Sequence, residues 1–404
     1  DTPVIEAAEV LLAKGGGETE KQIYRFEKGG SDLALRFDLT VPLAKYVAQN
    51  YGVLSFPFRR FQIGKVYRGE RAQRGRFREF YQADIDVIGD GQLDIVNEAE
   101  IPAIIYRTFT ALGLQRFQIR VNNRKILGGF YSMLGLGEKA GDIMRTVDKL
   151  EKIGPEKVTE ILTEELGVSD ADAEAILSFI SIRGSNGQVL EALEAWRGRD
   201  ALFDQGLEEL KAVAGYLSAF GVPERNFAVD LTIARGLDYY TGTVYETAML
   251  DHPEIGSICS GGRYDNLASQ GNKKYPGVGL SIGLSRLVSY MLHTAGAHAN
   301  RVSPASVLVA VWNEADRSAS NLIANQLRSR GIAADVAPTA AKLGKQIKYA
   351  DKLGIPYVWF PADASEEGAQ DEVKNIITGD QQPADAQSWE PDTVYAQQTV
   401  TVEA

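Results

Sequence analysis

Cysteine and histidine are nearly missing from this sequence, and their scarcity excludes several kinds of site. Cys259 is the only cysteine, so no disulfide can form within the chain, and a reducing compartment fits. The only histidines are His252, His293 and His298, and none of them has the spacing of metal ligands. Together these counts argue against a zinc site built from cysteine and histidine.

Long hydrophobic runs are also missing. No stretch of about 18 apolar residues occurs, so we expect no membrane-spanning helix. The chain opens with Asp1-Thr2-Pro3 instead of methionine, and it has no positive stretch followed by an apolar one. A secretion signal is therefore not visible, and we expect a cytoplasmic protein with a further segment upstream of Asp1.

Arginine, by contrast, is concentrated between Arg59 and Asp86. Residues 61–68 and 77–86 alternate apolar and polar side chains around a turn-prone stretch at 69–75, which predicts a β-hairpin. The net charge of −11 argues against loose nucleic-acid binding, so this basic segment indicates a local anion. Arginine matches phosphate oxygens bidentately, although basic residues also protect edge strands from aggregation. A phosphate site and a solvated basic edge both remain open.

The sequence pattern changes from strands to helices near Asn123 and changes back near Pro223. Within this interval, apolar residues recur at helical spacing over 143–150, 158–166, 171–182 and 190–196. Strand-like sequence returns at 227–231 and 242–246. We therefore predict an α+β fold with one antiparallel sheet, divided as 1–122 and 223–300, and a helical insertion over 123–222.

A stretch of small and polar residues at 295–300 indicates a domain boundary. Beyond it, strand patterns at 306–311, 333–336 and 355–360 alternate with helical patterns at 315–330 and 342–353. A length of about 100 residues is ordinary for a domain. The sequence therefore predicts a C-terminal α/β domain over 303–404.

Two groups of polar residues belong to the first part of the chain. In the first group, Asp38 and Thr40 would share one face of an extended segment, where a carboxylate and a hydroxyl suit an ammonium group. Alternatively, Thr40 caps a helix that begins at Val41-Pro42. The second group consists of Arg68, Glu70, Gln82 and Asp86, the last two on a common face of the hairpin's return strand.

Two further segments lie after the helical interval. In residues 232–242, a strand ends at an Arg235-Gly236 turn, and Tyr239 and Tyr240 precede the next strand, where structural tyrosines are also common. Residues 260–265 contain Tyr264, and 277–287 space glycines by two before Arg286 begins a helix. Such glycines let a backbone or a flat ligand approach closely, but strand–helix packing with a surface arginine explains them equally.

Taken in order, these motifs resemble those of the histidyl-tRNA synthetases, a family of class II aminoacyl-tRNA synthetases. The likeness runs from Asp1 to about Val400, and residues 234–242, Ala-Arg-Gly-Leu-Asp-Tyr-Tyr-Thr-Gly, are close to a family signature. Other class II synthetases share the Arg68, Glu70 and Arg286 elements but not that segment. The resemblance implies a class II antiparallel-sheet catalytic domain with a helical insertion and a C-terminal α/β anticodon-binding domain.

The resemblance also implies roles for individual residues. Arg68 would contact the α-phosphate of ATP and the carboxylate of histidine, Glu70 the adenine amino group, and Arg286 the adenine face. Arg235 would approach the α-phosphate, which makes Arg68 and Arg235 the implied catalytic residues. The residues implied to bind histidine are Asp38, Leu39, Thr40, Arg68, Gln82, Asp86, Arg235, Tyr239, Tyr240 and Tyr264.

Within that set, three side chains match residues that bind the α-amino group: Asp38, Thr40 and Gln82. Asp86 and Tyr240 match those that hold the two imidazole nitrogens. An apolar isostere of histidine would leave these buried groups unpaired, which can exclude it by roughly 10⁴-fold, so no editing domain is expected.

The implied reaction joins histidine and ATP into histidyl-adenylate and passes the histidyl group to the 3′-terminal adenosine of its tRNA. Histidine's own carboxylate attacks phosphorus, which agrees with a sequence that lacks a Ser-His or Cys-His nucleophile. Mg²⁺ would accompany ATP, with no metal bound by the protein alone.

The resemblance implies tRNA contacts and a homodimer as well. The helical insertion would contact the acceptor arm, the C-terminal domain the anticodon, and the dimer would form around Pro3. The candidate contacts to the RNA backbone are Lys342, Lys345, Lys348 and Lys352.

Two relatives of other function offer alternative interpretations. The regulatory subunit of ATP phosphoribosyltransferase is a binding protein that typically lacks the anticodon domain and has an eroded Arg235 segment, whereas both are intact here. A synthetase-like sensor domain of a kinase would require kinase sequence, and this chain contains none.

Overall fold

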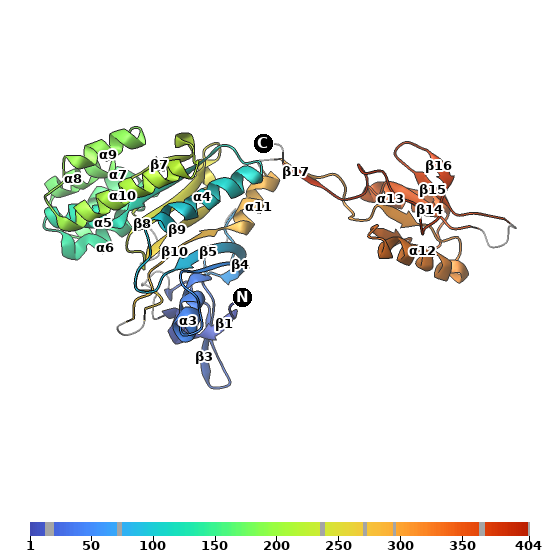
Figure 1. Ribbon diagram of the computed structural model, residues 1–404, viewed down its shortest axis with the longest axis horizontal. Coiled ribbons are helices and arrows are strands. Elements are labelled where there is room, and N and C mark those ends of the chain that lie inside the picture. The colour runs from blue at the N-terminus through green and yellow to red at the C-terminus, as the bar shows by residue number, and fades with distance from the viewer. Residues whose placement is uncertain are drawn as a thin grey trace. The chain divides into compact units, whose positions relative to one another are not determined.

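The computed structural model describes residues 1–12, 20–70, 75–234, 239–269, 273–293, 296–362 and 368–402. The chain divides into two compact units, Asp1–Met291 and Leu292–Glu403, and each is described by itself (Figure 1). Among the described residues, no helix combines the length and the apolar character needed to cross a membrane.

A seven-stranded sheet forms the centre of the first unit. Its strands, in spatial order, are β4 (Phe58–Tyr67), β5 (Glu79–Ile88), β10 (Gly277–Ile282), β9 (Cys259–Tyr264), β8 (Thr243–Met249), β6 (Phe117–Asn123) and β7 (Phe227–Val229). All neighbouring pairs are antiparallel except β6 and β7, which run parallel. The predicted antiparallel sheet and the predicted hairpin of β4 and β5 are confirmed.

The two faces of this sheet carry different residues because successive side chains in a strand point to opposite sides. Arg59 on β4 donates to Glu100 (2.7 Å) and Asn97 (3.0 Å) of helix α4 (Val96–Ala111), so α4 covers the face of the odd-numbered residues. The even-numbered residues of β4 and β5, Arg60 and Asp86 among them, face the other way.

A small layer packs on this second face. It contains β1 (Ile5–Ala7), β2 (Arg25–Lys28), β3 (Ser31–Leu35), α1 (Ala8–Leu12) and α3 (Thr40–Asn50). Helix α3 buries Val41, Leu43, Ala44 and Val47, and these residues share one apolar core with Ile88 and Tyr264 of the sheet. In Figure 1 this layer lies at the end of the unit away from the helical run.

The helical run stands between β6 and β7 in the sequence. Its elements are α5 (Arg124–Met133), α6 (Ala140–Val147), α7 (Leu150–Glu160), a π-helical segment (Ile161–Glu165), α8 (Asp170–Ile180), α9 (Asn186–Glu194) and α10 (Ala201–Ala219). Side chains of Asn123, Ser169, Ser185 and Asp200 cap α5, α8, α9 and α10 by accepting backbone N–H groups. Stacked Phe130 and Phe179, 3.9 Å between ring centroids, join α5 to α8.

The second unit contains a five-stranded sheet with helices α12 (Arg317–Ser329) and α13 (Leu343–Leu353). Its strands, in spatial order, are β13 (Ala334–Val336), β12 (Val307–Val309), β14 (Tyr357–Phe360), β15 (Glu372–Asn375) and β16 (Gln381–Pro383). The first three are parallel and the last two antiparallel. A separate pair joins β11 (Ala297–Ala299) to β17 (Val400–Val402). The α+β fold with a C-terminal α/β domain is thereby confirmed.

Candidate active site

The register of the β4–β5 hairpin determines which side chains meet on the second face. Arg60 lies opposite Asp86, Gln62 opposite Asp84, and Gly64 opposite Gln82. Gln82, Asp84 and Asp86 are all buried. Since strands pair with a fixed period of two, three polar side chains of β5 thus share one face with Arg60.

Asp86 carries the most informative set of contacts. The Tyr264 hydroxyl donates to its Oδ1 at 2.7 Å, and Arg60 Nη2 lies 2.8 Å from its Oδ2. The second contact is an ion pair without the alignment of a hydrogen bond, so Oδ2 has no donor among the described residues. Burial raises the pKa of the Asp86 carboxyl, while Arg60 and Tyr264 oppose the shift.

Asp84 and Arg60 were given no role by the sequence analysis. Asp84 accepts from Ser281 Oγ of β10 at 2.5 Å. Burial and the neighbouring Asp86 raise the pKa of Asp84 to about 7. The alternation of β5 could have identified Asp84, and the hairpin pairing could have identified Arg60 as the partner of Asp86.

The turn before α3 corrects one prediction. Asp38 and Thr40 do not share an extended segment, because Thr40 is the first residue of α3. The alternative interpretation is right that a helix starts here, but Thr40 is not its cap. The capping group is the carboxylate of Asp38, whose Oδ1 accepts from the Val41 N–H at 2.9 Å. Burial raises the pKa of Asp38, opposed mainly by that N–H and by Arg68.

The buried acids Asp38, Asp84 and Asp86 form an acid cluster, and the two tyrosines before β8 lie next to it. The Tyr239 hydroxyl donates to Asp38 Oδ2 at 3.2 Å, and its ring lies edge-on to Tyr240 and to Tyr264. Burial and nearby carboxylates raise the pKa of Tyr240 and of Tyr239, so both hydroxyls stay protonated.

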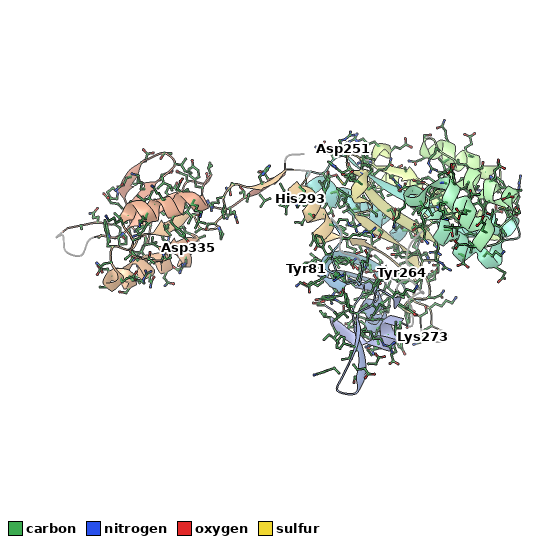
Figure 2. The ribbon with its side chains drawn as sticks, turned by 180° about the vertical axis from the view of Figure 1, so that it is seen from behind. Tyr81, Asp251, Tyr264, Lys273, His293 and Asp335 are labelled. Carbon is green, nitrogen blue, oxygen red and sulfur yellow. The ribbon has the colours of Figure 1, made fainter. Side chains whose placement is uncertain are left out.

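Glycines let the strands approach these side chains closely. A methyl group on Gly279 would stand 2.1 Å from Asp86 Oδ1, and one on Gly277 would stand 2.3 Å from the Tyr264 ring. On β9, a methyl on Gly262 would meet the Tyr240 ring at 3.1 Å. Gly277 and Gly279 thus make room for side chains of the site, among them Tyr264, which Figure 2 labels.

Arg68 lies at the end of the hairpin strand, next to the turn of Asp38. Its Nε donates to the Phe37 carbonyl at 3.2 Å, and its guanidinium lies over the Phe37 ring at 4.3 Å. Burial lowers the pKa of Arg68, and Asp38 and Glu70 oppose this. Glu70 itself forms an ion pair with Arg76, with 3.4 Å between Oε2 and Nη1.

Arg286 lies in the first turn of α11 (Leu284–His293), as predicted. Its Nε donates to the Gly75 carbonyl at 2.9 Å and its Nη1 to the Ser257 carbonyl at 2.6 Å. Burial lowers the pKa of Arg286, and the cations Arg76 and Arg68 act in the same direction. Cationic side chains therefore converge beside the hairpin.

Of the remaining predicted residues, two are described by the structure and one is not. Gln82 is buried, and its Oε1 has no hydrogen-bond donor in the described part of the chain. Leu39 is buried, and its carbonyl accepts from Arg60 Nη2 at 2.9 Å. Arg235 lies outside the described residues.

Chemically, the site combines buried acceptors, protonated hydroxyls and permanent cations. Protonated hydroxyls donate hydrogen bonds and carboxylates accept them, while guanidinium groups bind phosphate oxygens. The described ranges contain no cluster of three or more side chains suited to hold a metal ion. Such a site suits a ligand with N–H groups beside a phosphate.

Comparisons with known proteins identify the family. The antiparallel sheet with its arginines has the fold of a class II aminoacyl-tRNA synthetase. Residues 1–287 match the family model of histidyl-tRNA synthetase, and residues 306–388 match that of the anticodon binding domain. The chain therefore belongs to the histidyl-tRNA synthetase family.

Individual relatives agree with this assignment. The histidine–tRNA ligase of Bifidobacterium animalis subsp. lactis (strain AD011) is 55% identical, covering 100% of this chain and 91% of the relative. That of Clostridium tetani (strain Massachusetts / E88) is 51% identical, with coverages of 95% and 87%. The crystal structure of histidyl-tRNA synthetase from Nostoc sp. PCC 7120 is 38% identical, with a TM-score of 0.80 and coverages of 95% and 88%.

Proposed function

We propose that this chain activates L-histidine with ATP to histidyl-adenylate and transfers histidine to the 3′-terminal adenosine of its tRNA. Buried acceptors without donors support this proposal most directly. Buried polar groups are nearly always hydrogen-bonded in proteins, so Gln82 Oε1, and Asp86 Oδ2 with only its Arg60 ion pair, need a hydrogen-bond donor that the described residues do not supply. Histidine brings donors of the required kind, an imidazole N–H and an ammonium group.

The imidazole end of histidine belongs, in this proposal, between Asp86 and Tyr240. Asp86 accepts one ring N–H, and the protonated Tyr240 hydroxyl donates to the other nitrogen. Tyr264 fixes the carboxylate through Oδ1, and Oδ2, which forms an ion pair with Arg60 at 2.8 Å, can still accept a hydrogen bond from the ligand. Two buried polar partners discriminate strongly against an apolar side chain of the same shape.

The amino end belongs beside Asp38, Thr40 and Gln82. Tyr239 and the Val41 N–H orient the Asp38 carboxylate, one on each oxygen. An ammonium group would offset the cost of burying this acid, because a neighbouring opposite charge stabilises the ionised form.

ATP binds, in this proposal, through the arginines. Arg68 holds the α-phosphate and the carboxylate of histidine, Arg286 and Glu70 hold the adenine, and Arg235 approaches the α-phosphate. These groups catalyse by positioning and by stabilising negative charge at phosphorus. Mg²⁺ arrives with the phosphates of ATP.

The regions outside the sheet bind tRNA in this proposal. We assign the catalytic domain to 1–122 and 223–300, the insertion on the acceptor arm to 123–222, and the anticodon-binding domain to 303–404. The helical run between β6 and β7 supports the second assignment. Exposed lysines on and next to α13 are the candidates for contact with the RNA backbone: Lys342, Lys345, Lys348 and Lys352. We expect the enzyme in the cytoplasm, where translation uses charged tRNA.

The regulatory-subunit alternative has the same fold as the proposed ligase. The crystal structure of an ATP phosphoribosyltransferase regulatory subunit/histidyl-tRNA synthetase from Bacillus halodurans C has a TM-score of 0.68 at 22% identity, which shows a shared fold only. The anticodon-binding match at 306–388 favours the ligase.

Histidine-dependent exchange between ATP and pyrophosphate tests the proposal. With the unchanged chain, histidine should be the only amino acid that supports ATP–pyrophosphate exchange. No exchange in the presence of histidine would contradict the proposal. In Asp86→Asn the KM for histidine should rise about 10- to 100-fold, because a hydrogen bond to a charged group is worth roughly 1.5–3 kcal/mol. The KM for ATP should stay within about twofold in the same variant.

Asp90→Asn is the matched control for that measurement. Asp90 follows β5 in the sequence and is exposed, so removing its charge should leave the KM for histidine unchanged. An Asp86→Asn enzyme with the same KM for histidine as Asp90→Asn would remove Asp86 from the proposed site.

A further inference from the structure

Arg60 is a buried cation with an unusual distribution of contacts. Its side chain is 9% exposed, and one nitrogen, Nη2, makes both of its polar contacts. That nitrogen lies 2.8 Å from Asp86 Oδ2 and donates to the Leu39 carbonyl at 2.9 Å. Its Nε and Nη1 reach no acceptor among the described residues.

The two partners of Nη2 belong to different parts of the fold. Asp86 lies on β5, in register with Arg60 across the hairpin. Leu39 lies in the turn that leads into α3, between Asp38 and Thr40. A single nitrogen therefore links the sheet to the turn, and the link joins the two ends of the proposed histidine site.

We propose that Arg60 is a positioning residue for histidine, because it fixes the carboxylate of Asp86 relative to the backbone turn of Asp38, Leu39 and Thr40. This inference rests on the proposed function of the site. It adds a residue that touches neither ATP nor the reacting atoms and that acts through Asp86 and Leu39.

The charges around Asp86 support this assignment. Asp84 approaches it along β5, Asp38 from the turn before α3, Tyr264 from β9, and Tyr239 and Tyr240 from the segment before β8. Of these groups, the carboxylates disfavour an additional negative charge. Arg60 is the cation that lowers the pKa of all three acids, Asp38, Asp84 and Asp86.

The geometry also requires arginine at this position. A guanidinium group keeps its charge when buried, and its planar fork holds direction, whereas an ammonium group is a flexible point charge that loses its proton more readily. Arg60→Lys should therefore keep part of the electrostatic effect and lose part of the positioning effect.

Steady-state exchange kinetics of three variants test the proposal. Arg60→Met should raise the KM for histidine at least about tenfold and leave the KM for ATP within about twofold. Arg60→Lys should give an intermediate KM. Arg59→Met is the matched control, since Arg59 is the neighbouring residue, faces α4 on the opposite side of the sheet and should leave both constants unchanged.

The pH dependence of kcat/KM for histidine separates positioning from general support of the fold. Loss of the cation should move the acidic limb to higher pH in Arg60→Met, because Asp86 then protonates more easily. The pKa of Asp84 is raised to about 7, so this acid is already protonated on the acidic side of that value and Asp84→Asn should leave the limb where it is. Free histidine titrates identically in each assay, so the differences report on the protein.

The outcomes distinguish this inference from the proposed function. If the unchanged chain lacks histidine-dependent exchange, the proposed function fails. If that exchange is present and Arg60→Met keeps the KM for histidine and the acidic limb, the positioning role is overturned. If Arg60→Met does not fold, Arg60→Lys alone tests the positioning role. An unchanged KM for histidine in Arg60→Lys would overturn that role. A raised KM for histidine together with an unchanged KM for ATP would support it.

Discussion

Among single residues, Asp84 has the clearest consequence for stability. Its pKa is raised from an ordinary acid value to about 7 in the folded chain. Between those two values the unfolded chain releases the proton while the folded chain retains it. Stability must therefore fall as pH rises through this window and level off above it.

Asp84→Asn should remove this pH dependence. Each unit of pKa difference is worth about 1.4 kcal/mol, so the variant should gain on the order of 4 kcal/mol over the unchanged chain at pH 8. The gain should vanish near pH 4, and the amide oxygen can still accept from Ser281. Urea unfolding at both pH values measures the difference; an equal effect at pH 4 and pH 8 would refute the assigned pKa.

The resemblance named most residues of the proposed site but not how they are connected. Asp86, Tyr264 and Asp38 were named by resemblance, and the structure brings the first two into direct contact. Arg60 went unassigned because, in a run of arginines, only pairing across the hairpin distinguishes the residue opposite Asp86. A pattern along one strand does not contain its partner's register.

At the scale of secondary-structure elements, β10 controls how close the sheet comes to its acid cluster. Gly279 lies opposite Asp86 on β5 and opposite Gly262 on β9. A methyl group at this position would stand 2.1 Å from Asp86 Oδ1, well inside van der Waals contact. The strand therefore has no room for a side chain there.

Gly279→Ala should lower both stability and histidine affinity. Overpacking of this kind costs typically 1–3 kcal/mol, and displacement of the Asp86 carboxylate should raise the KM for histidine. Thermal unfolding and exchange kinetics measure the two effects. Gly215→Ala is the control, because that exposed glycine of α10 has no neighbour within 4 Å and alanine there should stabilise the helix by up to about 1 kcal/mol.

Helices and strands were predicted from the sequence where the spacing of their apolar residues is regular. The hairpin strands were predicted because each alternates apolar and polar residues over most of its length, and α8 and α12 because their apolar residues recur at helical spacing. Helix α10, 19 residues long, was not among the predicted segments, although Asp200 caps it. Asp38 was assigned to an extended segment in one interpretation, although its hydrogen bond to the Val41 N–H three residues ahead is a local signal of a helix start.

On the scale of the whole molecule, one face of the first unit carries large apolar side chains at its surface. Phe61 and Ile63 of β4 are 78% and 58% exposed. Tyr81 of β5, which Figure 2 labels, is 44% exposed. These residues alternate along the hairpin on the face that also carries α4. Contiguous apolar patches on a monomer often mark a protein–protein interface, and this one would suit the homodimer that the family resemblance implies.

The double variant Phe61→Lys and Ile63→Lys should therefore weaken self-association. The unchanged chain should sediment at about twice its 44.1 kDa mass, and the variant should move toward a single chain because opposed lysines repel. Val53→Lys is the control, since Val53 is 83% exposed elsewhere in the unit and should not alter the mass. If the unchanged chain sediments as one 44.1 kDa species at micromolar concentration, the expectation of a homodimer is contradicted.

The parallel pairing of β6 with β7 has a consequence for how the architecture tolerates variation. Parallel neighbours cannot be joined by a tight turn and require a long return path, which the helices between Arg124 and Ala219 provide. This excursion leaves the sheet and comes back at its far edge, so its length can change without altering any antiparallel ladder. A shortened chain would still need a bridge of about a dozen residues, or the last strand would have no route back to its neighbour.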